Sequence, residues 1–231
     1  MPAVGKDEII QTSVALYFSD KPPKRQLSSI LLSVRDIDIP PGESRYKREL
    51  AFQLPIDVHL YGIFPHAHYL CEEMYAHATA RNGERNELLH IPKWDFDWQD
   101  DYRFEKPITL LAGTKLSLEY FYNNSTTNVR NPNNPPLRVG YGEQSTEAMG
   151  DLILYLDPVR ASDRPKLRSA YLRFQYEKSL RRHRERLAAD PNSPRANNAV
   201  AESLLLLGET CLLYTSPSPR DATLSRMPSS A

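Results

Sequence analysis

Residues 74–91 decide the fold class, and they read MYAHATARNGERNELLHI. Strand-like runs over residues 74–80 and 88–91 flank the tetrapeptide Arg81-Asn82-Gly83-Glu84. An Asn-Gly pair between two such runs is the strongest short-range signal for a β-hairpin. The stretch therefore predicts two antiparallel strands joined by a short turn.

Further runs of strand length lie on both sides of this hairpin, and proline, glycine, asparagine or aspartate bounds them. The predicted strands cover residues 13–18, 50–54, 58–64, 116–122 and 152–156. Residues 128–136 are expected to form a long loop, and loops of that length in compact domains usually have a function. Short strands separated by turn residues predict an all-β sandwich or barrel up to about Tyr155.

The composition excludes several classes of partner. The chain has 231 residues, and its 29 basic side chains balance its 29 acidic ones. A net charge of zero gives no general attraction to nucleic acid, so we expect no nucleic-acid partner. No window approaches the ~18 apolar residues of a membrane helix, so we expect no membrane partner either. Two cysteines in dissimilar surroundings, Cys71 and Cys211, imply no disulfide framework.

The character of the sequence changes at about Arg160, where the apolar residues Leu167, Ala170, Tyr171 and Phe174 take helical spacing. We predict a β domain over residues 1–159 and a helical segment over 160–209. Within that segment a helix, a turn containing the sequence DPNSP and a second helix resemble the junction between two tetratricopeptide repeats. The second repeat is incomplete, and a protein partner of these helices is one expectation.

Residues 210–231 are predicted to be a disordered tail. From Cys211 onward the sequence resembles the translated sequencing-adapter read-through found at the ends of some reading frames, so we treat it as non-native. Its serine and proline content also favours disorder. At the other end, the first residues lack the basic start and apolar run of a secretory signal. Either the protein is cytoplasmic or its true N-terminus is missing.

One pair among the six histidines has the spacing of metal ligands. His66 and His68 are separated by Ala67 just beyond an apolar run. If that run is a strand, alternate residues share one face about 6.6 Å apart, so that the two imidazoles can converge on one metal. Two solvent-facing rings would show the same spacing, so a metal site needs a third ligand.

Met149 is the candidate for that third ligand. It lies in a polar, glycine-bounded turn over residues 142–151, whereas a methionine of the core is expected within a strand. A thioether is a soft donor, and two imidazoles with one thioether favour Cu(I) over zinc, calcium or magnesium. The residue chemistry alone leaves a copper site and a packing role open.

A family resemblance extends over roughly residues 5–157. The segments that carry it are GIFPHAHYL (62–70), WDFDWQ (94–99), NPNNPP (131–136) and GEQSTEAMGD (142–151). Together they resemble the C-terminal domain of the copper type II, ascorbate-dependent monooxygenases. More distantly they are similar to peptidylglycine alpha-hydroxylating monooxygenase and dopamine beta-monooxygenase, and more closely to bacterial members with appended tetratricopeptide repeats.

The resemblance implies a jelly-roll-like antiparallel β-sandwich in which His66, His68 and Met149 are the metal-binding and catalytic residues. They would hold the copper that binds dioxygen and hydroxylates a C–H bond, with ascorbate as the reductant. In the family a second copper, held mostly in a preceding domain, passes electrons. The chain begins about where the last histidine of that site would have passed, so we expect the electron-transfer domain to be missing and this fragment to be inactive alone. A periplasmic or secreted location is then favoured over a cytoplasmic one.

Three positions depart from the family pattern. Phe64 and Ile153 stand where the peptide-amidating enzymes have an arginine and a tyrosine that engage the substrate carboxylate, so glycine-extended peptides are not the expected substrate. Cys71 replaces the usual glycine after the His-x-His-x-Leu motif. A thiol near copper can ligate or oxidise, but we favour a buried, inert side chain.

Two alternatives stay open beside the monooxygenase. One is a non-catalytic β-sandwich that presents tetratricopeptide repeats to a protein partner, and the other is a copper-storage or copper-sensing module. The remaining histidines, His59, His77, His90 and His183, are expected to be ordinary surface or core imidazoles, and His183 is expected to be solvated. Four aromatic residues are candidates either for a substrate cleft or for packing: Trp94, Trp98, Tyr102 and Phe104.

Overall fold

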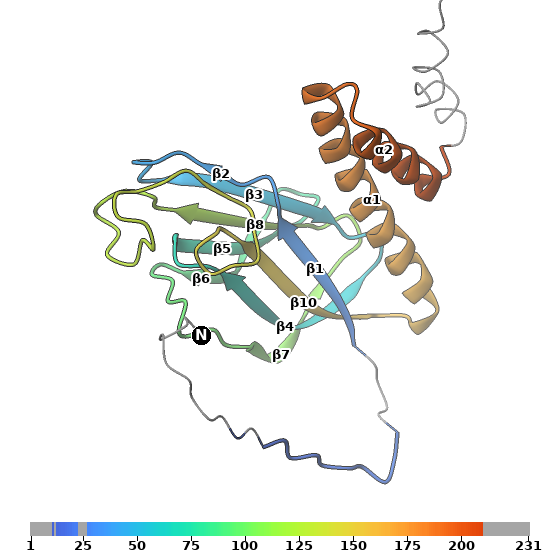
Figure 1. Ribbon diagram of the computed structural model, residues 1–231. Coiled ribbons are helices and arrows are strands. Elements are labelled where there is room, and N and C mark those ends of the chain that lie inside the picture. Colours follow the sequence, from blue (N-terminus) through green and yellow to red (C-terminus); the bar gives the residue numbers. More distant parts are fainter. Residues whose placement is uncertain (1–10, 12, 23–26, 210–231) are drawn as a thin grey trace, which may run out of the picture. The chain divides into compact units, whose positions relative to one another are not determined.

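The computed structural model describes residues 11, 13–22 and 27–209. Contacts divide the chain into two compact units between Ala161 and Ser162. The first unit is built from strands and the second from helices (Figure 1). The mostly β fold with a short helical extension is as the sequence predicts.

Two four-stranded antiparallel sheets form the layers of the β unit (Figure 1). The first sheet has the strand order β1 (Ser28–Val34), β10 (Gly150–Pro158), β4 (Val58–Ala67), β7 (Tyr102–Leu110). The second has the order β3 (Tyr46–Gln53), β8 (Lys115–Tyr122), β5 (Cys71–Thr79), β6 (Arg85–Ile91). The short strands β2 (Asp38–Ile39) and β9 (Val139–Gly140) form a separate pair.

The connections between these strands follow a jelly roll. Counted in chain order without β2 and β9, the eight long strands lie in the orders 1-8-3-6 and 2-7-4-5. Each sheet thus alternates strands from the two halves of the chain, as in a pair of interlocked Greek keys. One consequence is that β4 and β10, which are distant in sequence, lie side by side.

Alternation of side chains produces the core between the sheets. In β8 the residues Leu116, Leu118, Tyr120 and Tyr122 are buried, and the residues between them are partly exposed. In β10 the residues Leu152, Leu154 and Leu156 are buried in the same way. Side chains that alternate with them lie on the outer faces of the sheets.

The predicted hairpin is confirmed as β5 and β6. These strands pair antiparallel from Thr79 and Arg85 to Met74 and Ile91, and Gly83 adopts a φ of 88° in the turn. The strand predicted over residues 116–122 is confirmed as β8, and the strand predicted over 152–156 is the centre of β10.

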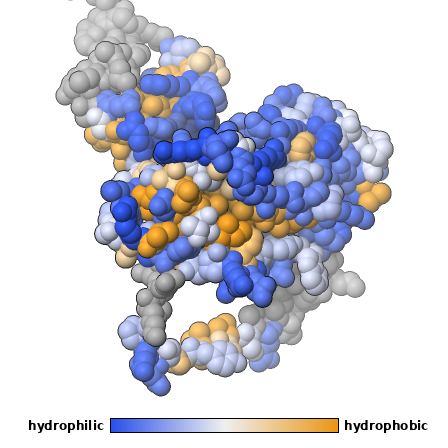
Figure 2. All heavy atoms as spheres, turned by 180° about the vertical axis from the view of Figure 1, so that it is seen from behind, coloured by the Kyte–Doolittle hydropathy of each residue, from blue (hydrophilic) through white to orange (hydrophobic). Residues whose placement is uncertain are grey.

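The strand predicted over residues 13–18 is wrong. None of its described residues lies in a strand, and the side chains of Val14, Leu16, Tyr17 and Phe18 are exposed. In Figure 2 this segment lies between two grey stretches, with its hydrophobic atoms on the surface. A strand-like composition does not form a strand without a partner to hydrogen-bond with, and no described strand pairs with these residues.

Four other strands differ from the prediction. β3 starts at Tyr46 rather than at residue 50, because its charged residues face outward while it pairs with β8. β4 continues past Pro65 to Ala67. Its pairing with β7 ends at Ile63, so Pro65 has a neighbouring strand on one side only, where a proline is tolerated. β1 and β7 were not predicted.

Residues 123–138 form the predicted long loop, which is fixed from within. Asn124 is fully buried, and its side-chain nitrogen donates to the carbonyl oxygens of Ile39, Pro40 and Leu137 at 3.2, 3.0 and 2.7 Å. Arg130 in this loop forms an ion pair with Asp95. The loop is therefore tied to residues 94–99, which lie beside the two candidate histidines.

The helical unit contains α1 (Arg164–Ala189) and α2 (Pro194–Leu207). The side-chain oxygen of Ser193 caps α2, and Gly208 ends it with a φ of 75°. Leu180, Val200 and Leu204 form its small core. His183 remains partly exposed but also has partners that were not predicted: its Nδ1 lies 3.1 Å from both the carbonyl oxygen of Ala199 and Oγ of Ser203 on the facing helix.

Among the described residues no helix has the length and apolar character needed to cross a membrane. The predicted tail over residues 210–231, including Cys211, lies outside the part of the chain that the structure describes.

Candidate metal centre

His66 and His68 lie at the end of β4, on the outer face of the first sheet. Ala67 between them is fully buried toward the core, so the side chains on either side of it point the other way. The centroids of the two imidazole rings are 5.2 Å apart, and the rings are perpendicular. From these positions the two imidazole rings can bind one metal ion, as expected from their spacing.

Both rings are held through the same nitrogen. Nδ1 of His66 lies 2.5 Å from Oε1 of Gln99, and Nδ1 of His68 lies 3.1 Å from the carbonyl oxygen of Glu147. The amide of Gln99 is oriented because its nitrogen donates to the carbonyl oxygen of Phe96 at 2.8 Å. Since both partners are acceptors, each Nδ1 carries the proton and each Nε2 carries a lone pair. Metal-binding histidines in proteins are commonly oriented in this way.

The surroundings of His68 keep its ring neutral. Its side chain is buried, and burial lowers its pKa below the usual value; the neighbouring His66 lowers the pKa further, while the hydrogen bond to Glu147 opposes these effects. A neutral imidazole is the form that binds a metal ion. Phe96 packs edge-on against this ring at 6.0 Å between centroids and also contacts Tyr69 at 4.3 Å.

Met149 immediately precedes β10, and His68 immediately follows β4. Gly150 is the partner of Ala67 in the pairing of β10 with β4, so the next position along each strand brings Met149 opposite His68. Gly150 and Ala67 are both buried toward the core. If the alternation continues one residue beyond each strand, Met149 belongs to the same outer face as the two histidines. The arrangement of the backbone thus brings the three predicted ligands to one end of the sheet.

Two buried tyrosines of β8 hold this end of β10 from across the core. The hydroxyl of Tyr122 donates to the carbonyl oxygen of Met149 at 3.1 Å, and the hydroxyl of Tyr120 donates to that of Asp151 at 2.5 Å. A Cβ atom at Gly150 would lie within 3.0 Å of the Tyr122 hydroxyl. A glycine is therefore needed between Met149 and Asp151 for the tyrosine to reach the backbone.

Asp151 is a neighbour of the pair that the sequence did not indicate. It is the partner of His66 in the pairing of β10 with β4, and it lies on the same face of the sheet. Its Oδ1 atom is buried and has no hydrogen-bond partner among the described residues. The face therefore carries the lone pairs of two Nε2 atoms and a carboxylate oxygen.

The charge of Asp151 makes this face attractive to a cation. An unpaired buried carboxylate oxygen is unfavourable unless a positive charge or a donor comes close. With Met149 the donor set contains two imidazoles and one thioether, which is the chemistry that suits Cu(I). Within residues 11, 13–22 and 27–209, no group of three or more His, Cys, Asp or Glu side chains has the arrangement of a metal site. A site formed by these residues thus depends on the sulfur of Met149 as its third donor.

The four aromatic candidates do not form one cleft wall. Trp94 is buried, whereas Trp98 is 71% exposed. Tyr102 and Phe104 lie on the edge strand β7. The aromatic residue that contacts the site is Phe96, together with Gln99 from the same segment. Its role was not predicted, because it depends on how the loop before β7 folds over the end of β4.

Cys71 is buried as predicted. Burial raises the pKa of its thiol well above the usual value, and the thiol points at the carbonyl oxygen of Glu73 at 3.8 Å. A protonated, buried thiol is neither a good metal ligand nor a reactive nucleophile.

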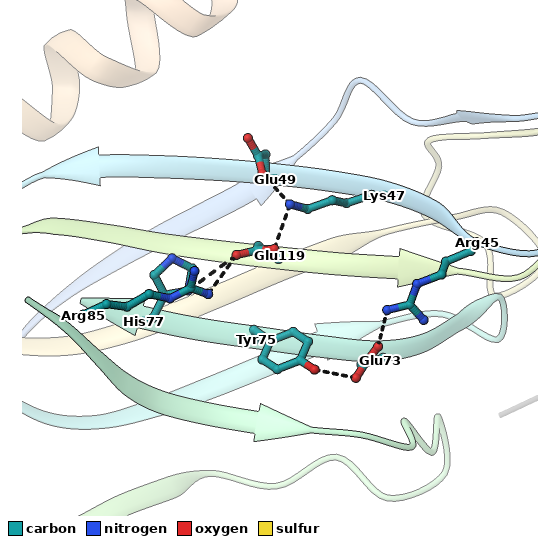
Figure 3. Close-up of polar contacts among 8 residues, drawn as sticks. All are labelled: Arg45, Lys47, Glu49, Glu73, Tyr75, His77, Arg85 and Glu119. Carbon is teal, nitrogen blue, oxygen red and sulfur yellow. Dashed lines mark hydrogen bonds and ion pairs between the residues drawn. The ribbon is translucent and has the colours of Figure 1, made fainter. Parts of the chain in front are cut away.

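His90 lies 3.2 Å from Glu73, whereas His77 belongs to a separate polar network on the outer face of the second sheet (Figure 3). Glu119 is its centre, with ion pairs to Lys47 at 2.8 Å and to Arg85 at 3.1 Å. Burial lowers the pKa of His77, and the adjacent Arg85 lowers it further. His90 stacks on Tyr75 at 4.1 Å between ring centroids. These two histidines therefore have structural partners, as expected.

His59 lies within β4, and its Nδ1 is 3.0 Å from the hydroxyl oxygen of Thr109 on β7. It is separated from His66 by most of the strand. Of the six histidines, the described structure thus brings only His66 and His68 to a shared face beside Met149.

Comparison of the sequence with protein-family models and with curated proteins gives no match.

Proposed function

We propose that the β unit is the oxygen-activating copper domain of an ascorbate-dependent monooxygenase. In this reaction one oxygen atom of dioxygen enters a C–H bond of the substrate and the other leaves as water. Two electrons from ascorbate and two protons complete the balance. The observation that carries the proposal is that His66 and His68 both donate through Nδ1 and leave both Nε2 lone pairs without a described partner, beside Met149.

Each residue of the proposed copper centre would have a distinct role. His66 and His68 would bind the copper through Nε2, with Gln99 and the Glu147 carbonyl fixing the orientation of the rings. Met149 would add a soft donor that favours the reduced state. Copper, when bound, would supply the chemistry of dioxygen, while the protein supplies geometry and an open coordination position.

An apolar strip beside the centre supports an apolar rather than an anionic substrate. Phe64 and Ile153 are partners in the pairing of β4 with β10, one step along the outer face from His66 and Asp151. Both side chains are partly exposed. Neither can bind a carboxylate, whereas the carboxylate of Asp151 would repel one. Glycine-extended peptides are therefore not part of the proposal.

We also propose that the partner of the β unit is a separate copper domain that transfers electrons to it. A centre formed by His66, His68 and Met149 holds one copper, which can deliver one electron at a time, so the second electron must come from elsewhere. In addition we propose that α1 and α2 begin a tetratricopeptide array that binds a protein partner, since they form a helix, a short turn and a second helix.

Turnover should require the second domain. The experiment loads the chain with copper, adds ascorbate, labelled dioxygen and an alkylbenzene as apolar probe, and follows labelled alcohol. We expect hydroxylation only when a three-histidine copper domain of the family is added, and none with His66→Ala. Positioning of a substrate can account for several kcal/mol of a barrier, so the chain alone should be very slow.

Two results would contradict this account in different ways. Steady turnover by the chain alone, lost in His66→Ala, would make it a self-sufficient oxygenase. Tight copper binding without product in any combination would favour a copper-storage or copper-sensing module.

A further inference from the structure

We propose that Asp151 tunes the proposed copper centre toward the oxidised state, as a negative charge beside His66 and His68. This inference rests on the proposed function, because it assigns a role to a residue of the same site. The position of Asp151 in the sheet and the lack of a partner for its Oδ1 atom among the described residues carry it.

The sheet register brings Asp151 to the centre. It is the direct partner of His66, and directly opposed residues of antiparallel strands have Cβ atoms about 4.5–5.5 Å apart. Its main-chain carbonyl is held by the hydroxyl of the buried Tyr120. Its negative charge acts on His68 as well, where it raises the pKa of the ring. The backbone at this position is therefore fixed, and the side chain of Asp151 lies on the same face of the sheet as that of His66.

No described positive group satisfies the carboxylate oxygen. On its other side Asp151 is the partner of Ser33 in β1, and Ser33 accepts a hydrogen bond from Nε of Arg35 at 3.3 Å. The guanidinium of Arg35 also lies over the ring of Tyr141, 5.5 Å from its centroid. The described structure gives it no bond to Asp151, whose Oδ1 atom remains without a partner. A buried anionic oxygen without a donor is costly, which favours a cation close to it.

The charge of Asp151 distinguishes the two oxidation states of copper. A neighbouring negative charge attracts a doubly charged ion twice as strongly as a singly charged one at the same distance. A carboxylate is also a hard group, unlike the thioether of Met149. The centre would thus combine a soft group that favours Cu(I) with an anionic group that favours Cu(II), so that copper stays bound through a redox cycle.

Removal of this charge should lower the affinity for Cu(II) more than that for Cu(I). We define the affinity ratio as the affinity for Cu(II) divided by that for Cu(I). We expect Asp151→Asn to lower this ratio about tenfold, equivalent to a rise of ~59 mV in the one-electron potential of the copper. Met149→Ala should change the ratio in the opposite direction. The affinities are measured on the full chain by competition with a Cu(I) chelator and, separately, with a Cu(II) chelator.

The controls separate charge from folding. Glu87→Gln removes the same charge from an exposed site on β6, in the other sheet, and should leave the ratio unchanged. Asp151→Glu keeps the charge, so its ratio of Cu(II) affinity to Cu(I) affinity should stay close to that of the wild-type chain. If Asp151→Asn does not fold, Asp151→Ser provides a second neutral variant, with the thermal unfolding midpoint measured for each.

The outcomes also separate this inference from the proposed function. In one outcome the affinity ratio of Asp151→Asn stays within twofold of the wild-type value, while His66→Ala abolishes copper binding. This result overturns the role of Asp151 and leaves the copper centre intact. Wild-type chain that binds neither Cu(I) nor Cu(II) overturns both.

Discussion

Copper binding is expected to disappear in the double variant His66→Ala, His68→Ala. Both rings are oriented by hydrogen bonds that leave Nε2 as the only ring nitrogen available to a metal. Loss of residues that merely orient such ligands already weakens metal binding about 10–100-fold. Removal of both nitrogens should therefore lower the affinity for Cu(I) by more than about a hundredfold. Competition with a Cu(I) chelator measures it.

The matched control is His59→Ala, which removes an imidazole from the same strand. His59 contacts Thr109 and lies at the other end of β4, so its loss should leave copper binding unchanged. Equal affinities of the double variant and the wild-type chain would show that copper, if bound, is held elsewhere. The site would then have no part in the function of the protein.

Gly150→Ala is expected to destabilise the sandwich and disturb the centre together. The new Cβ atom would approach the hydroxyl of the fully buried Tyr122 within 3.0 Å and a ring carbon of Tyr120 at 3.2 Å. Overpacking of this kind costs about 1–3 kcal/mol of the free energy of unfolding. Since Gly150 lies between Met149 and Asp151, a shift of β10 should also weaken Cu(I) binding. Chemical denaturation and chelator competition measure the two effects.

A double-mutant cycle identifies the cause. Tyr122→Phe removes the hydroxyl that the new methyl group would meet, so the two changes together should cost less than the sum of the single changes. Gly140→Ala is the control, because its Cβ would have only one neighbouring atom within 4 Å, at 3.7 Å. Full additivity in the cycle would contradict the steric account.

The hairpin and the strand β8 could be predicted because their signals are local. An Asn-Gly turn and an alternation of buried and exposed residues lie within a few residues of one another. β7 was missed because it is an edge strand with Glu105, Lys106 and Pro107 at its centre, residues that protect an edge and hide a strand pattern. In β1 the inward residues Ile30, Leu32 and Val34 alternate, but the intervening Leu31 obscures the alternation.

The strand predicted over residues 13–18 failed for the opposite reason. Its composition favours a strand, but a strand also needs a pairing partner, and partners are set by the topology of the whole domain. Local sequence carries no information on that point. The same limit explains why the sequence indicated His66, His68 and Met149 but not Asp151 or Gln99. All five lie in segments that carry the resemblance, but Asp151 and Gln99 become neighbours of the histidines only through the register of β4 and β10 and the loop before β7.

X-ray absorption at the copper edge of the Cu(I)-loaded chain tests the central claim most directly. The account predicts two imidazole nitrogens at about 2.0 Å and one sulfur at about 2.3 Å from the metal, the lengths usual for such donors in proteins. The sulfur signal should vanish in Met149→Ala, while the imidazole signal remains. Scattering by nitrogen and oxygen alone in the wild-type chain, or a sulfur signal that persists in Met149→Ala, would contradict a centre formed by His66, His68 and Met149.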